Sequence, residues 1–183
     1  GYDQKGYSTK LGYDNKNNIK TSIELSQNQG TNIYSEDYGT SNLAQREFKN
    51  RLINTNTEVK VTPDVMISAR YSNFKDQEHY IQSSSYSSSD TSRNEGDINA
   101  KWQFTQAQNI LIGASTDNNQ FKDASMTNGK QEVTSNGYYL QHQYQTEKLN
   151  TQMGIRLEDN KKYGTHTVGQ SAISYQILPL TST

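Results

Sequence analysis

Nine short stretches of the chain alternate apolar and polar residues with a period of two. The clearest runs from Leu149 to Leu157 (LNTQMGIRL), where Leu, Thr, Met, Ile and Leu fall on one side and Asn, Gln, Gly and Arg on the other. Successive side chains of a β-strand point to opposite faces, so this stretch forms a ribbon with one apolar and one polar face. Nine such ribbons, joined alternately by tight turns and long polar loops, are typical of a transmembrane β-barrel wall.

Turn-forming residues separate the ribbons. The sequences DNKNN at 14–18 and TPD at 62–64 are the clearest turns, and further turns are expected at 106–109 and 146–148. The predicted ribbons cover residues 7–13, 19–25, 53–61, 65–71, 98–104, 110–114, 138–144, 149–157 and 167–177. Long polar loops are predicted at 27–50, 75–96, 118–135 and 158–165, and the Ser-rich run at 83–89 is expected to be a mobile loop.

The predicted connections are sorted by length, because tight turns follow the odd-numbered ribbons and long loops follow the even-numbered ones. Outer-membrane barrels show this sorting, with short turns on the periplasmic side and long loops outside. The sequence therefore predicts an all-β fold, an antiparallel meander of about nine strands that forms part of a transmembrane β-barrel. Single-chain bacterial barrels have even strand numbers, and an open sheet leaves backbone groups unpaired in lipid. We therefore expect residues 1–183 to be a partial barrel, a piece of a larger one.

The polar composition fits this fold. Hydrophobic residues make up 30% of the chain, against the usual ~45–50%, and the mean hydropathy is −1.02. A soluble sandwich of this composition would struggle to fill a core, whereas a barrel needs only one apolar face. The net charge of −1 comes with no basic stripe for nucleic acid. Cysteine is absent, so disulfides and thiol chemistry are excluded.

The alternation assigns two sets of side chains to opposite faces. Aromatic residues on the apolar face are predicted to form girdles at the membrane interfaces; they are Tyr7, Tyr13, Tyr71, Trp102, Phe104, Tyr138, Tyr144 and Tyr175. Charged residues on the polar face are predicted to line the barrel interior, either as a solvated wall or as contacts for a polar substrate; they are Lys10, Lys20, Glu24, Glu58, Lys60, Arg70, Lys101 and Arg156.

Residues for bond-making chemistry are scarce. The three histidines, His79, His142 and His166, stand apart and show no metal-ligand spacing. His142 lies between two glutamines, with no adjacent serine nucleophile or orienting group. We therefore expect no enzymatic activity, no cofactor and no bound metal ion.

Four tyrosines fall in the predicted long loops and are the candidate substrate-binding residues: Tyr34, Tyr38, Tyr80 and Tyr86. Tyrosine offers a large contact area at a small cost in conformational entropy, and it can stack on a planar ligand. Packing of the loops on themselves is the alternative role.

Parts of the chain resemble a known family. Residues 59–80 (VKVTPDVMISARYSNFKDQEHY) and 109–176 resemble the barrel of TonB-dependent outer-membrane receptors, most closely the vitamin B12 (cobalamin) transporter group. The most specific part is RLEDNKKYGTHTVGQSAISY at 156–175. The resemblance implies a barrel of about 22 strands, with an N-terminal plug and uptake of a scarce nutrient driven by TonB. No plug or TonB box is seen in this chain, which again indicates part of a larger protein.

The function expected from this reading is transport in the bacterial outer membrane. The transported molecule is a nutrient chelate, with cobalamin the first choice and a ferric siderophore the second. The expected partners are outer-membrane lipid, the chelate and, through a plug outside this chain, the TonB system. The alternative is a passive porin or a surface adhesin whose extracellular loops bind ligands. A soluble β-protein is the third possibility.

Overall fold

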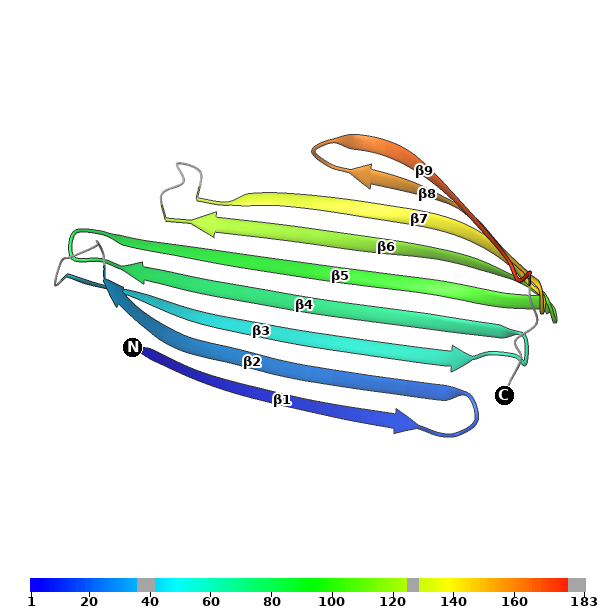
Figure 1. Cartoon of the computed structure of the whole chain (residues 1–183), viewed down its shortest axis with the longest axis horizontal. Helices are drawn as coiled ribbons and strands as arrows, with labels where there is room; N and C mark the ends of the chain where they lie inside the picture. The colour runs from blue at the N-terminus through cyan, green and yellow to red at the C-terminus, as the bar shows by residue number, and fades with distance from the viewer. Residues whose placement is uncertain (36–41, 125–128, 178–183) are drawn as a thin grey trace.

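The computed structural model describes residues 1–35, 42–124 and 129–177, and these form a single curved layer of long antiparallel strands (Figure 1). Each strand pairs with the next along the chain, in the order β1 to β9. The strands are β1 (Tyr2–Asp14), β2 (Ile19–Ser35), β3 (Leu43–Lys60), β4 (Val65–Ile81), β5 (Tyr86–Thr105), β6 (Gln108–Asp123), β7 (Gln131–Gln145), β8 (Leu149–Asn160) and β9 (Gly164–Tyr175). The predicted antiparallel meander is therefore confirmed. No helix among the described residues could cross a membrane.

The two ends of the sheet are named here by the connections that they carry. The turn end carries the connections at 15–18, 61–64, 106–107 and 146–148, and the loop end carries those at 36–42, 82–85, 124–130 and 161–163. Side chains form the first turn, where Asn15 Oδ1 accepts hydrogen bonds from the backbone N–H groups of Asn17, Asn18 and Ile19 at 2.9–3.0 Å. Asn commonly closes turns in this way, and the predicted turn is confirmed.

The prediction of long polar loops was wrong. Most residues of the segments 27–50, 75–96 and 118–135 belong to strands that continue past the predicted ribbons. The Ser-rich run is split, with Ser83 to Ser85 in a short turn and Tyr86 to Ser89 in β5. The prediction relied on apolar–polar contrast, which is lost where both faces are polar. The backbone ladder needs no such contrast, because a pairing register set at the turn end continues along both strands.

One face of the sheet carries an apolar belt next to the turn end. Residues in register across the sheet, such as Ile67, Ala100, Ile112, Leu140 and Ile155, share this face. Their large side chains are open, with Ile112 58% and Ile155 54% exposed. A soluble protein rarely exposes a continuous apolar surface of this size, whereas lipid covers it in a barrel wall. We call the parts of the strands under this belt the belt half.

The aromatic residues predicted to form girdles lie on this face and mark the two edges of the belt. Trp102 and Phe104 lie near the turn end, with their ring centres 5.5 Å apart. Tyr7, Tyr71 and Tyr138 lie in the middle of their strands, where the apolar residues stop. The strands then continue for several residues with polar side chains on both faces. We call these outer parts, from the second aromatic edge to the loop end, the loop half.

No conventional core supports the sheet. Within the described ranges the only buried apolar side chain is Ala44, and Asn73 and Asn109 are the buried polar ones. A single layer cannot bury both faces by itself. The belt half therefore depends on a bilayer outside, while the polar face needs only water, a ligand or another polar segment.

Candidate functional site

The polar face of the loop half carries a compact group of charged and aromatic side chains on β3 and β4. Arg46 lies directly across from Tyr80, and Phe48 lies across from Glu78. The Arg46 guanidinium forms an ion pair with the Glu78 carboxylate, which also accepts a hydrogen bond from the Tyr80 hydroxyl at 2.7 Å. These four residues, Arg46, Phe48, Glu78 and Tyr80, are called the Arg46 cluster.

Two aromatic rings flank the guanidinium of this cluster. Its central carbon lies 5.5 Å from the ring centre of Phe48 and 5.9 Å from that of Tyr80, within the range of cation–π attraction. The Phe48 ring lies over Gly30, where a Cβ would come within 2.9 Å of two ring carbons. Glycine at position 30 thus leaves the space in which Phe48 covers the neighbouring strand.

The charges of the cluster reinforce one another. Glu78 is seven residues beyond Tyr71 and lies outside the membrane-spanning part of β4. Burial raises the pKa of the Glu78 carboxyl, but the hydrogen bond from Tyr80 and the contacts with Arg46 outweigh it, so the pKa lies below its ordinary value. The carboxylate is therefore charged at neutral pH and holds the guanidinium in place.

Four buried polar atoms around the cluster have no hydrogen-bond partner among the described residues. They are Asn32 Oδ1, Arg46 Nε, Asn50 Oδ1 and Asp76 Oδ1, and all four belong to polar-face side chains of β2, β3 and β4. A buried polar group without a partner costs about 1–3 kcal/mol. This part of the wall is therefore suited to contact with a polar ligand, another protein segment or water.

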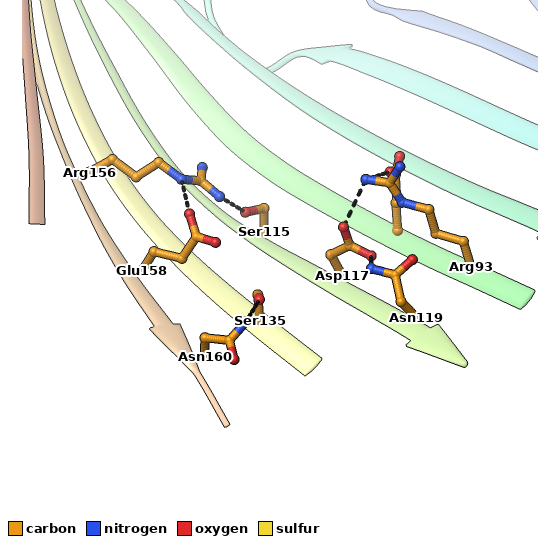
Figure 2. A network of polar contacts seen from close by, with 9 residues as sticks. Arg93, Ser115, Asp117, Asn119, Ser135, Arg156, Glu158 and Asn160 are labelled. Carbon is orange, nitrogen blue, oxygen red and sulfur yellow. Dashed lines mark hydrogen bonds and ion pairs between the residues drawn. The ribbon is translucent and has the colours of Figure 1, made fainter. Parts of the chain in front are cut away.

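A second polar network crosses β5 to β8 on the same face (Figure 2). Arg93 forms ion pairs with Asp117 at 2.8 Å and Glu95 at 2.5 Å. Arg156 donates a hydrogen bond to Ser115 Oγ at 2.9 Å and pairs with Glu158 at 3.4 Å. Arg93 thus links β5 to β6, and Arg156 reaches from β8 across β7 to β6. These contacts fix the wall and leave charged groups facing the interior.

A hollow of about 370 Å³ lies beside Arg156. Tyr139 forms one wall and donates a hydrogen bond to Asp97 at 2.9 Å. The Tyr139 ring fills the space above Gly113, where any Cβ would collide with it. Gln141 and Gln170 add amide groups to the hollow. Its lining can hydrogen-bond a polar molecule but contains no nucleophile paired with a base.

The four candidate tyrosines do not form one site. Tyr34 and Tyr80 lie in β2 and β4 on the polar face, and Tyr80 belongs to the Arg46 cluster. Tyr86 begins β5 on the opposite face, where its ring centre is 6.0 Å from that of His79. Tyr38 lies outside the described residues. The assignment of Tyr34, Tyr80 and Tyr86 to loops was wrong, and their role in binding remains a prediction.

Sequence reasoning missed Arg46, Phe48 and Glu78, because it placed them in loops. A weak signal was present, since Ala44, Arg46, Phe48, Asn50 and Leu52 alternate with outward-facing polar residues in the phase opposite to the belt. The charged residues assigned to the polar face do lie there; for example, Arg70 lies opposite Asp97 in the register of β4 and β5, and Lys20 lies opposite Glu58 in that of β2 and β3. In the described ranges, no three His, Asp or Glu side chains are grouped to hold a metal ion.

Comparison with known proteins gives similarity in structure only. No protein-family profile matches the sequence, and no curated protein matches it.

Several solved structures share the architecture. The siderophore receptor PirA from Acinetobacter baumannii matches 97% of this chain with a TM-score of 0.70 and 15% identity, and the match covers 32% of PirA. The FrpB iron transporter from Neisseria meningitidis matches 94% with a TM-score of 0.72 and 12% identity, covering 34% of FrpB. PirA from Pseudomonas aeruginosa matches 97% with a TM-score of 0.71 and 14% identity, covering 31% of that protein.

These similarities define the class of fold. The chain has the architecture of an outer-membrane β-barrel wall and spans about a third of the length of the proteins that it resembles. The bacterial outer membrane is the location that this architecture implies. Identities of 12–15% show the fold alone.

Proposed function

We propose that the chain is part of the barrel of an outer-membrane receptor that takes up a ferric siderophore, with energy supplied through TonB. The support comes from the nine-stranded wall, from its likeness to structures described as siderophore receptors and an iron transporter, and from the family resemblance of residues 59–80 and 109–176. The sequence puts cobalamin first, whereas the similar structures favour an iron chelate. The mechanism is binding and passage, and the chain makes or breaks no bond in its substrate.

The Arg46 cluster is the observation that carries the proposal. It places a guanidinium between two aromatic rings on the polar face, beyond the belt and near the outer mouth of the barrel. Catecholate and hydroxamate groups of siderophores are planar and rich in oxygen. A guanidinium can donate to such oxygens, and the rings can stack on such planes. The unpartnered oxygens of Asn50 and Asp76 add acceptors for polar groups at the rim of the chelate.

The test is uptake by cells that produce the full-length protein or lack it. The probes are a ⁵⁵Fe-labelled ferric tris-catecholate, a ⁵⁵Fe-labelled ferric tris-hydroxamate and radiolabelled cyanocobalamin, each supplied with TonB present and absent. The expected result is TonB-dependent uptake of a ferric chelate by producing cells only. Uptake of cyanocobalamin alone would show that the substrate is cobalamin and not a ferric chelate. TonB-independent entry of all three probes would identify a passive porin.

A pair of variants links uptake to the cluster. Arg46→Gln should weaken binding of the chelate by about 10- to 100-fold, since a hydrogen bond to a charged group contributes about 1.5–3 kcal/mol. Lys60→Gln is the matched control, because Lys60 lies on the same strand and face but at the turn end. Equal losses in both variants, measured as the Kd of the purified receptor, would contradict a role for the Arg46 cluster.

A further inference from the structure

A band of positive charge crosses the outward face of the sheet just beyond the apolar belt. Two registered rows carry it. One row reads Lys5, Gln29, Lys49, Gln77, Asp90 and Lys122 across β1 to β6, and the row beside it reads Tyr7, Gln27, Arg51, Lys75, Ser92 and Gln120. We call Lys5, Lys49, Arg51, Lys75 and Lys122 the basic band. All five side chains belong to exposed residues on the same face as the belt.

The charge of these rows is unbalanced. Five cationic residues and one acid, Asp90, give 5 − 1 = +4 over twelve positions. Asp90 accepts a hydrogen bond from the Gln77 amide at 3.0 Å. Within the described part of the chain, no member of the basic band forms an ion pair. On β1 to β3, the acids Asp3 and Glu47 come in the next row toward the loop end. On β7 the second row continues with Glu132, which forms an ion pair with Lys130. The excess positive charge therefore lies on β1 to β6 and within two rows.

The distance of the basic band from the edge of the apolar belt places it at the level of the lipid headgroups. Arg51 is two residues beyond the belt residue Ile53, and Lys75 is four residues beyond Tyr71. At about 3.3 Å per residue, these cations lie within about 13 Å of the belt edge along the strand, and the tilt of barrel strands shortens this height further. Lysine and arginine at such positions extend their charged ends to the polar boundary.

A shallow hollow within the rows offers a place for an anion. It measures about 260 Å³, and its lining includes Lys75 and Lys122 with Gln77, Ser92 and Gln120 between them. The carboxylate of Asp90 and the hydroxyl of Thr91 also line the hollow. The Gln77 amide donates a hydrogen bond to Asp90, so one carboxylate stands against two ammonium groups and several neutral donors. Phosphate oxygens accept hydrogen bonds and carry negative charge, so they complement both properties of this hollow.

We propose that the basic band binds the phosphate groups of glycolipids in the outer leaflet of the outer membrane. The lipid chains lie against the apolar belt, and their phosphorylated headgroups contact Lys49, Arg51 and Lys75. This inference depends on the position of the sheet in the membrane and is independent of the transported substrate. It adds an interaction surface on the face opposite to the Arg46 cluster.

The test uses the full-length protein, purified in detergent and stripped of lipid. Equal amounts of bis-phosphorylated lipid A and its dephosphorylated form are added, and retained lipid is measured by native mass spectrometry. The variant K49Q/R51Q/K75Q removes three cations of the basic band. The matched control K20Q/K60Q/K101Q removes three lysines from the polar face, at the turn end. Circular dichroism of each protein verifies its strand content.

The wild-type protein and the control should retain about tenfold more of the phosphorylated lipid than of the dephosphorylated one. Each basic residue near an anionic headgroup adds a small favourable contribution to the binding free energy. In K49Q/R51Q/K75Q this preference should disappear. Equal retention of both lipids by the folded wild type would overturn the proposal, as would a preference that survives in the variant. Displacement of the lipid by inorganic phosphate alone would also overturn it, by showing a site for the free ion.

Discussion

The belt half and the loop half of the same strands differ in what surrounds them. In the belt half, Ile67, Ile112 and Ile155 face outward with large exposed fractions, and only lipid can cover them. In the loop half, the same face carries Lys49, Gln77 and Lys122, and the opposite face carries the Arg46 cluster. The backbone ladder continues through both halves. Backbone pairing between strands therefore holds both halves of the sheet together. The side chains determine whether each half is stable against lipid or against water.

The largest expected effect comes from putting a charge into the belt. Ile112→Lys should lower the free energy of unfolding by about 2–4 kcal/mol, because the ammonium would face lipid near the middle of the bilayer. Gln120→Lys is the matched control, on the same strand and face but in the loop half, and it should change stability by less than about 0.5 kcal/mol. Urea unfolding of the protein in lipid vesicles measures the free energy of unfolding of both variants. Similar losses of stability in the two would contradict the difference in surroundings between the halves.

A smaller effect is expected from crowding the loop half. Gly30→Ala would place a Cβ against the backbone oxygen of Asp3 and within 2.9 Å of the Phe48 ring. The substitution should cost about 1–3 kcal/mol, the usual range for overpacking. Gly6→Ala serves as the control, since its Cβ would meet only ordinary contacts at 3.8 Å and beyond. Hydrogen exchange of the backbone amides of β1 to β4 should quicken in the loop half of Gly30→Ala alone. Unchanged exchange there would show that the close packing around Gly30 does not hold this region.

The smallest effect depends on pH. The pKa of Glu78 is lowered in the folded protein, so its ion pair adds stability at pH values above the unfolded pKa of about 4.3, and this contribution is lost as the pH falls through the folded value. Glu78→Gln should therefore be less stable than the wild type by about 1 kcal/mol at pH 7, since the pair is half-buried. Urea titrations should show the difference shrinking below about pH 4. A difference independent of pH would assign the effect to packing.

The sequence predicted the belt half well and the loop half poorly. Every predicted ribbon lies within or largely overlaps a strand, because residues such as Leu149, Met153 and Ile155 contrast with polar neighbours. The outer parts of β2 to β7 were missed because Gln, Asn and Ser on both faces give no period to detect. The Arg46 cluster was missed for the same reason. Its contacts join residues 46 and 78, which only the register of β3 and β4 brings together.

The boundary between the two halves can be measured directly along β4. Cysteine is absent from the chain, so single cysteines carrying a spin label can replace the outward-facing residues Val65, Ile67, Ala69, Tyr71, Asn73, Lys75, Gln77 and His79 in the protein embedded in lipid. The first four labels should be accessible to oxygen dissolved in the bilayer, and the last four to a water-soluble nickel chelate. A change between positions 71 and 73 would support a barrel wall with strands that continue beyond the membrane. Access of the nickel chelate to all eight positions would contradict it.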